Sequence, residues 1–112
     1  MSLELRRLIL FTANLADMTA FYRDVIGLQV VGQEEGWVDF NAGVCRLALH
    51  VGKSKVGARP PKIVFHAADV AGARASLIKR GLADAGPVKS GNFDMCDCKD
   101  PDGNRFQISS RP

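Results

Sequence analysis

Apolar and polar residues alternate in some stretches of this chain and recur at helical spacing in others. Leu5–Thr12 alternates, which predicts a strand with partly buried faces. Asn14 is expected to be the N-cap of a helix with Asp17 in the capping-box position, and Gly27 predicts where that helix ends. Between them, apolar residues at helical spacing are interpreted as core: Leu15, Met18, Phe21, Tyr22, Val25 and Ile26. Three strand-like runs follow, over Leu28–Gln33, Trp37–Asn41 and Val44–Val51.

The same order of elements then begins again. Residues 53–61 carry Gly, Ser and a Pro pair without periodicity, so we interpret them as the joint between modules 1–52 and 62–112. Lys62–Ala67 predicts a strand, and Asp69 is expected to cap a second helix that ends near Lys79 and Arg80. Three further strand-like runs lie around Gly86–Ser90, Phe93–Lys99 and Asn104–Ser109.

This order indicates an internal βαβββ repeat. Ile63 and Gly81 stand 54 residues after Ile9 and Gly27. A ferredoxin-like chain is excluded, because it has two strands between its helices and this chain has four runs there. One helix per module covers only one face of its sheet. We therefore predict a single α+β domain in which two βαβββ modules form a curled mixed sheet of eight strands, with helices outside and a cleft inside.

Composition and charge narrow the class of protein. The 112 residues suit one domain, and 46% apolar with 24% charged residues is ordinary for a soluble globular protein. Net charge is +3, but the basic residues are dispersed, so nucleic acid is not an expected partner. We expect no membrane association, since no apolar stretch approaches ~20 residues and the N-terminus lacks a signal-peptide core. A cytoplasmic location is the corresponding expectation.

The three cysteines are an odd number. Cys96 and Cys98 are two residues apart, which on a strand places both thiols on one face. We interpret them, together with Cys45, as small apolar side chains in a reducing cytosol, with metal or redox roles as the alternative.

Two motifs resemble a known family. Asp100–Asn104 reads DPDGN, where Pro101 presets a turn dihedral and Gly103 accepts positive φ. This turn, together with FYRDVIGL over residues 21–28, is similar to patterns of the vicinal oxygen chelate superfamily, which contains glyoxalases, bleomycin-resistance proteins and extradiol dioxygenases. The resemblance covers nearly the whole chain and implies the glyoxalase/bleomycin-resistance/dioxygenase fold. It does not assign a reaction, because the superfamily includes unrelated chemistries and non-catalytic binders.

The resemblance also implies where a divalent metal would bind. Its enzymes use two side chains per repeat, usually His, Glu or Gln, and the positions fall on Arg7, Ala48, Lys62 and Gln107. Arg stays protonated, Ala has no donor atom and Lys would have to lose its proton, so only Gln107 suits the role. We therefore predict no family-type metal site and no cofactor. A shift of register that brings in His50, with Asp97 or Asp39, is the alternative, and His66 is a further candidate ligand.

Strand parity predicts which side chains face the cleft. The predicted ligand-binding residues are Arg7, Phe11, Trp37, Arg46, His50, Lys62, Arg105 and Gln107. Four of these are cations near aromatic rings, which favours an anionic or aromatic ligand. The alternative is that the cations pair internally with Asp39 and Asp97.

Two functions of different class remain. The first is a metal-independent small-molecule-binding protein, expected to be a homodimer whose sheets complete one another's clefts. The second is an enzyme: a lyase, isomerase or dioxygenase with a relocated or degenerate metal site, or a metal-free catalyst that uses His50 as general base. On either reading we expect Arg7, Lys62 and Gln107 to converge in one cleft.

Overall fold

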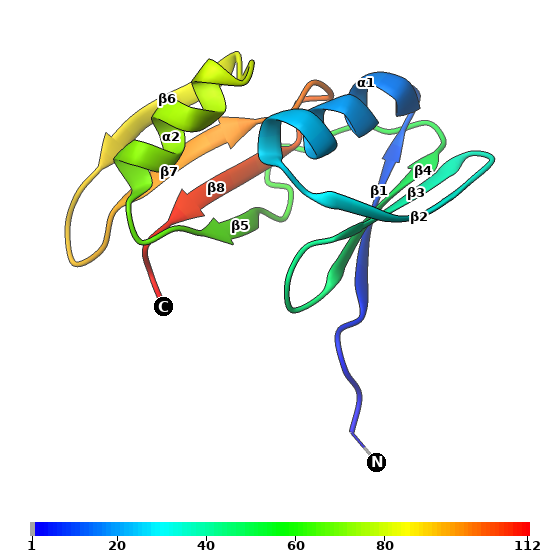
Figure 1. Cartoon of the computed structure of the whole chain (residues 1–112), viewed down its shortest axis with the longest axis horizontal. Helices are drawn as coiled ribbons and strands as arrows, with labels where there is room; N and C mark the ends of the chain where they lie inside the picture. Colours follow the sequence, from blue (N-terminus) through cyan, green and yellow to red (C-terminus); the bar gives the residue numbers. More distant parts are fainter. Residues whose placement is uncertain (1) are drawn as a thin grey trace. The chain divides into compact units, whose positions relative to one another are not determined.

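The computed structural model describes residues 2–112, which divide into two compact units, residues 2–55 and 56–112. Each unit has the order strand, helix and three strands, as Figure 1 shows. The predicted α+β class with two βαβββ modules is therefore confirmed. Within the described residues the eight strands form two four-stranded mixed sheets.

The first unit is built on the sheet order β1-β4-β3-β2, in which β1 and β4 are parallel and the other pairs are antiparallel. Its elements are β1 (Arg7–Thr12), α1 (Leu15–Ala20), η1 (Phe21–Ile26), β2 (Gln29–Glu34), β3 (Trp37–Asn41) and β4 (Arg46–Val51). The ring of Tyr22 lies 6.3 Å from that of Phe40, so the helix covers the face of the sheet that carries Phe40. Leu47 and Leu49 are buried on the same face.

The helix of this unit differs from the prediction in its N-terminal cap and in the geometry of its last turns. Asn14 makes no side-chain capping hydrogen bond, so the expected capping box is wrong. Its backbone N–H instead donates to Thr12 Oγ1 over 2.9 Å. At the other end the last turns widen into the π-helical segment η1, and Gly27 with φ 88° ends it as predicted. The N–H of Leu28 then donates to the Tyr22 carbonyl over 2.9 Å.

The second unit repeats this plan with the sheet order β5-β8-β7-β6. Its elements are β5 (Ile63–His66), α2 (Val70–Lys79), β6 (Asp84–Lys89), β7 (Met95–Lys99) and β8 (Arg105–Ser109). Asp69 caps α2 as predicted, because its carboxylate accepts the N–H of Gly72 over 2.9 Å. Val70 and Leu77 of α2 are buried, as are Phe106 and Ile108 of β8.

Strand register corrects one detail of the repeat. Ile63 pairs with Phe106, whereas Ile9 pairs with Ala48 on the face away from the helix. The residue equivalent to Ile63 is therefore Leu8, which pairs with Leu47. A spacing of 54 residues holds for the helix-ending glycines but not for the first strands, because the stretch from the start of the helix to its glycine is one residue longer in the first unit (Leu15 to Gly27) than in the second (Val70 to Gly81).

The turn between β7 and β8 forms as its motif predicts. Asp100 is buried, and its Oδ1 accepts the N–H groups of Asp102 (3.0 Å) and Asn104 (2.9 Å). Its Oδ2 accepts the Asn104 side-chain amide over 2.9 Å, and Gly103 takes φ 85°. This turn fixes Lys99 opposite Arg105, the first residue of β8.

Candidate functional site

The candidate site in the first unit is the face of its sheet away from the helix. Side chains alternate along a strand, so residues next to Phe40 and Leu47 point to this face. Paired positions give three rows across β1, β4 and β3: Phe11–His50–Trp37, then Ile9–Ala48–Asp39, then Arg7–Arg46–Asn41. This grouping agrees with the parity predicted from the sequence.

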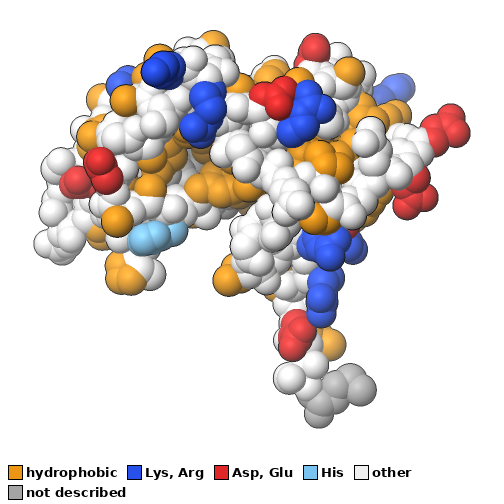
Figure 2. Space-filling view, in the orientation of Figure 1, with side chains coloured by type: hydrophobic (Ala, Val, Ile, Leu, Met, Phe, Trp, Pro, Cys, Tyr) orange, Lys and Arg blue, Asp and Glu red, His pale blue; other side chains and the backbone are white. Residues whose placement is uncertain are grey.

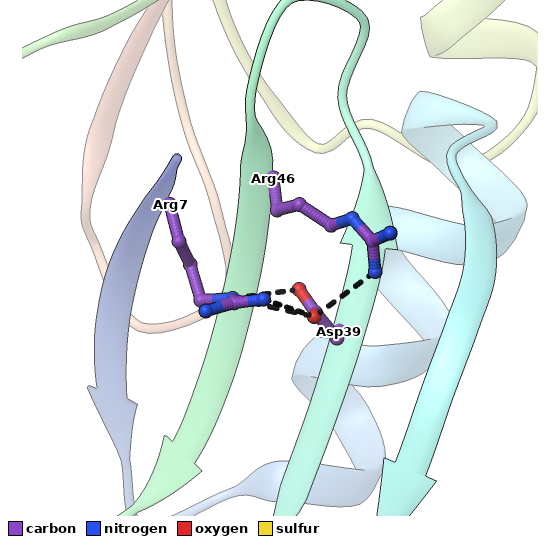
Figure 3. A network of polar contacts seen from close by, with 3 residues as sticks. All are labelled: Arg7, Asp39 and Arg46. Carbon is purple, nitrogen blue, oxygen red and sulfur yellow. Dashed lines mark hydrogen bonds and ion pairs between the residues drawn. The ribbon is translucent and has the colours of Figure 1, made fainter. Parts of the chain in front are cut away.

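A three-residue ionic cluster joins two of these rows (Figure 3). Arg7 Nε lies 3.3 Å from Asp39 Oδ1 and 3.2 Å from Oδ2, and Arg7 Nη2 donates to Oδ2 over 2.9 Å. Arg46 Nη1 reaches the same Oδ2 at 3.3 Å. The Asp39 side chain is only 7% exposed, against 32% for Arg7 and 42% for Arg46. The two guanidinium groups therefore compensate a buried carboxylate.

The opposite row is aromatic. The His50 ring centroid lies 5.5 Å from that of Phe11 and 5.9 Å from that of Trp37. Arg7 connects the two ends of the face, since its guanidinium carbon lies 5.6 Å from the Trp37 ring centroid. Phe11 is 51% exposed, so this row offers ring surface to a ligand.

The tautomer of His50 follows from one hydrogen bond. Its Nδ1 lies 2.7 Å from the Val51 carbonyl oxygen, which can only accept. Nδ1 must therefore carry a proton, and in the neutral ring Nε2 keeps its lone pair. His50 is exposed, so Nε2 can accept a hydrogen bond or a proton.

The corresponding face of the second unit is organised around Asp97. Asp97 Oδ1 accepts hydrogen bonds from Lys62 Nζ and from Gln107 Nε2, each over 3.0 Å. The bond from Gln107, followed by the bond and charge of Lys62, lowers the pKa of the Asp97 carboxyl. The Gln107 amide also contacts Met95 Sδ at 3.5 Å. These two contacts of the amide nitrogen therefore fix the orientation of the Gln107 side chain.

Asp39 and Asp97 occupy equivalent positions in the two sheets. Asp39 pairs with Ala48, which pairs with Ile9, and Asp97 pairs with Gln107, which pairs with Val64. The cation two residues before Ile9 is Arg7, and the cation two residues before Val64 is Lys62. Each module therefore joins its central aspartate to a cation from its first strand.

The predicted site residues fall into two groups by unit. Arg7, Phe11, Trp37, Arg46 and His50 share the open face of the first sheet. Lys62, Arg105 and Gln107 share that of the second, where Asp97 joins Lys62 to Gln107. Convergence of these two groups in one cleft stays a prediction.

Internal pairing of the cations was the alternative to a ligand, and it is found for three of the four. Arg7 and Arg46 bind Asp39, and Lys62 binds Asp97. No hydrogen bond or ion pair of the Arg105 side chain occurs within residues 2–112. Arg105 is thus the cation of this set that remains open to a ligand.

The residues at the implied metal positions do not fit a metal ion. Arg7 has no lone pair to donate, Ala48 is fully buried without a donor atom, and Lys62 forms an ion pair with Asp97. Gln107 alone could offer an oxygen, and one neutral carbonyl does not hold a divalent ion. No group of three or more His, Cys, Asp or Glu side chains suited to a metal, with or without His50 and His66, occurs in the described part of the chain.

Cys96 and Cys98 lie on the helix-facing side of β7, with their sulfur atoms 3.7 Å apart. Both are buried, and burial, followed by the hydrogen bond with Cys96, raises the pKa of the Cys98 thiol to about 12. These properties agree with the interpretation of the pair as apolar filling.

Two pockets were not identified from the sequence. One, of about 530 Å³, lies where residues 4–6 meet the β3–β4 loop, and Arg46 borders it. The other, of about 220 Å³, lies in the second unit and includes Asp84 and Lys99 beside Lys62 and Arg105. Alternation along Met95-Asp97-Lys99 was the signal that could have placed Lys99 on this face.

Basic side chains are visible singly or in small groups over the face drawn in Figure 2.

Among residues 2–112 there is no helix with the length and apolar character needed to cross a membrane.

Comparison with known proteins identifies the family of this fold. A model of the Glyoxalase/Bleomycin resistance protein/Dioxygenase superfamily matches residues 4–108. No curated protein matches the chain in sequence.

Solved structures with this fold carry different functions. A glyoxalase/bleomycin resistance protein/dioxygenase from Nocardioides has a TM-score of 0.83 at 17% identity, over 97% of this chain and 83% of that one. Lactoylglutathione lyase from Agrobacterium tumefaciens has a TM-score of 0.74 at 21% identity, over 94% and 91%. An antibiotic-binding protein from Streptomyces has a TM-score of 0.76 at 19% identity, over 96% and 94%. At these identities the similarity establishes the fold.

Proposed function

The chain belongs to the Glyoxalase/Bleomycin resistance protein/Dioxygenase superfamily, and from that premise we propose that it is a metal-independent small-molecule-binding protein. Its ligand carries an aromatic ring, an anionic group or both. The structures that share its fold include an antibiotic-binding protein as well as a lyase, so the fold is compatible with binding without catalysis.

The observation that supports metal independence is the chemistry of the four implied metal positions. Two of them are the cations Arg7 and Lys62, and each forms an ion pair with an aspartate, Asp39 or Asp97. These two positions therefore carry cationic side chains in place of lone-pair donors, which disfavours a metal ion there and favours an anion.

The proposed ligand class rests on the face of the first sheet. Residues two apart on a strand are ~6.7 Å apart, so the backbone positions of the aromatic row and the arginine row are separated by ~13 Å. The Arg7 guanidinium spans part of this distance and lies 5.6 Å from the Trp37 ring centroid. A planar group stacked near Phe11 and Trp37 and an anionic group near Arg7 and Arg46 would match these two ends. Arg46 is the freer of the two arginines, because it contacts Asp39 through one nitrogen at 3.3 Å.

A ligand screen read by thermal shift tests this proposal. Aromatic acids are compared with aliphatic acids of similar length, each with and without chelator, because binding to the folded state raises Tm. We expect shifts from aromatic acids, unchanged by chelator, and at least a roughly tenfold weaker affinity in Trp37→Ala from the lost stacking surface. Ile78→Ala, at an exposed apolar residue of α2 outside both pocket linings, is the control. Shifts that require added metal would overturn the proposal.

A metal-free enzyme is the second candidate function. The observation that favours it is the fixed tautomer of His50, which leaves Nε2 free to accept a proton beside two rings. A ligand from the screen, incubated in D₂O, should then exchange a carbon-bound proton in the wild type but not in His50→Gln. Absence of exchange in the wild type would exclude this role.

We also propose that the protein is a homodimer. β1 is an edge strand of its sheet, and its apolar side chains Leu8, Ile9 and Phe11 are 40% to 51% exposed. An edge strand of this kind is a favourable site for a second copy to cover.

A further inference from the structure

Three cations form one row across the open face of the second sheet. Lys99 pairs directly with Arg105 between β7 and β8. Ile63 pairs with Phe106 in the parallel pair β5–β8, so Lys62, one residue earlier, lies beside Arg105. Arg105 is thus flanked by a lysine on each side.

This row is not neutralised in the way its counterpart is. In the first sheet the equivalent row contains Arg7 and Arg46, and Asp39 binds both. In the second sheet Asp97 binds Lys62 and the Gln107 amide. Within residues 2–112 neither Lys99 nor Arg105 has a side-chain hydrogen bond or an ion pair. Asp84 of β6 stands opposite Lys99 but forms no ion pair with it within residues 2–112. Like charges directly opposite on neighbouring strands are destabilising, so the Lys99–Arg105 pair favours an added anion.

A pocket lies at this row. Its volume is about 220 Å³, and its lining includes all three cations together with Asp84 and Asp97. Pockets for drug-sized ligands measure about 300–1,000 Å³, so this one suits a small group. Gly86 also lines it, and a Cβ at that position would lie 2.9 Å from the Asp97 carbonyl oxygen. A residue without a side chain therefore lets β6 approach β7 closely beside the pocket.

We propose that this pocket binds an oxyanion group, phosphate or carboxylate, with Arg105 at its centre and Lys99 and Lys62 on either side. The planar guanidinium of Arg105 can donate two hydrogen bonds to one oxyanion, and the lysines act as point charges. This inference deepens the proposed function by adding a recognition site for an anionic group in the second unit. The oxyanion site itself is argued independently, and the inference rests on the proposed function only for the identity of the complete ligand.

Titration of the full-length protein with inorganic phosphate, followed by backbone NMR, tests the site directly. Sodium chloride at matched ionic strength is the reference, and malonate is the carboxylate arm. We expect saturable shifts at Lys62, Gly86, Lys99 and Arg105 that chloride does not produce. Saturation by phosphate alone assigns a phosphate group, and saturation by malonate alone assigns a carboxylate; either supports the site.

Two variants test how much oxyanion affinity each cation contributes. Arg105→Gln and Lys99→Gln should each weaken binding roughly tenfold or more, because each removes a charge-assisted hydrogen bond. Lys79→Gln changes net charge equally at the end of α2, outside the pocket lining, and should leave binding unchanged. Both pocket side chains are exposed, so we expect the variants to fold, and Arg105→Lys provides a milder second test.

The outcomes separate this site from the proposed function. Absence of saturable shifts with both oxyanions, or equal weakening in Lys79→Gln and Lys99→Gln, would overturn the oxyanion site. Phosphate binding without any ligand that depends on Trp37 would retain the site and remove the proposed function. A ligand whose binding depends on Trp37, in a protein that binds neither oxyanion, would retain the proposed function and remove the oxyanion site.

Discussion

The guanidinium group of Arg7 donates from Nε and Nη2 to the carboxylate of Asp39, across the intervening strand β4. Arg46 reaches that carboxylate through one nitrogen only, at 3.3 Å. Since Asp39 is nearly buried, its negative charge is compensated mainly by Arg7. The stability of the first unit should therefore be unequally sensitive to the two arginines.

We predict that Arg7→Ala lowers the free energy of unfolding by about 1–3 kcal/mol, because it leaves a buried carboxylate with one long contact. Arg46→Ala should cost less, within the ~0–1 kcal/mol of a partly exposed ion pair. Urea denaturation of both variants measures the difference. In Arg7→Ala/Asp39→Ala, part of the loss should be recovered, since no carboxylate is left unpaired. A larger effect of Arg46→Ala would contradict this ranking.

Asp97 should make stability depend on pH in the acid range. Its pKa is lowered below the ordinary value of 3.8 by Gln107 and then Lys62. A lowered pKa in the folded state gives stability that is complete above the unfolded-state value and is lost as pH falls through the folded-state value. Tm measured from pH 6 downward should thus fall below about pH 4, and Asp97→Asn should flatten that fall. An identical acid profile in the variant would exclude Asp97 as a contributor.

Cys98 should be unreactive in the folded protein. Its pKa is raised to about 12 from an ordinary 9.0, so almost no thiolate forms near neutral pH. Cys45, which is less buried than Cys96 and Cys98, should be alkylated first by iodoacetamide, as mass spectrometry can show. Cys45→Ser should then remove labelling of the native protein, while urea restores it at the other two. Labelling of Cys98 as fast as Cys45 would contradict its burial.

Metal analysis of protein purified without chelator should find no stoichiometric zinc, nickel, manganese or iron. The expectation follows from the donor set at Arg7, Ala48, Lys62 and Gln107, of which only Gln107 offers an oxygen. About one equivalent per chain, lost in His50→Ala, would instead indicate a relocated metal site.

Light scattering at micromolar concentration should give the mass of a dimer. The exposed apolar edge strand β1 is the basis, so Ile9→Lys should shift the protein toward monomer while circular dichroism stays unchanged. A monomeric wild type would remove this part of the proposal.

The sequence predicted the elements of this fold well because apolar periodicity follows from local geometry. Gly27 ends a helix through its left-handed backbone conformation and Asp69 starts one through its side-chain carboxylate, and both functioned as expected. Asn14 did not, because a residue type that can cap a helix does so only when its side chain reaches the first-turn N–H groups.

The candidate site was predictable in its faces but not in its pairings. Because side chains alternate along any strand, the sequence pattern assigned Arg7, Trp37 and His50 to the same face of the sheet. Whether Asp39 would bind Arg7, Arg46 or both depends on which strands are neighbours and in which register. Lys99 was missed for the same reason, because only the pairing with β8 brings it opposite Arg105.

The carbonyl oxygen of Gly86 connects the strand that lines the pocket of the second unit to its helix. It accepts the Arg74 Nε–H of α2 over 2.8 Å and the Cys96 thiol over 3.2 Å. The same residue lies against the Asp97 backbone and lines the pocket. Arg74 of α2 therefore holds a residue that lines the anion pocket, although Arg74 itself is not part of the lining.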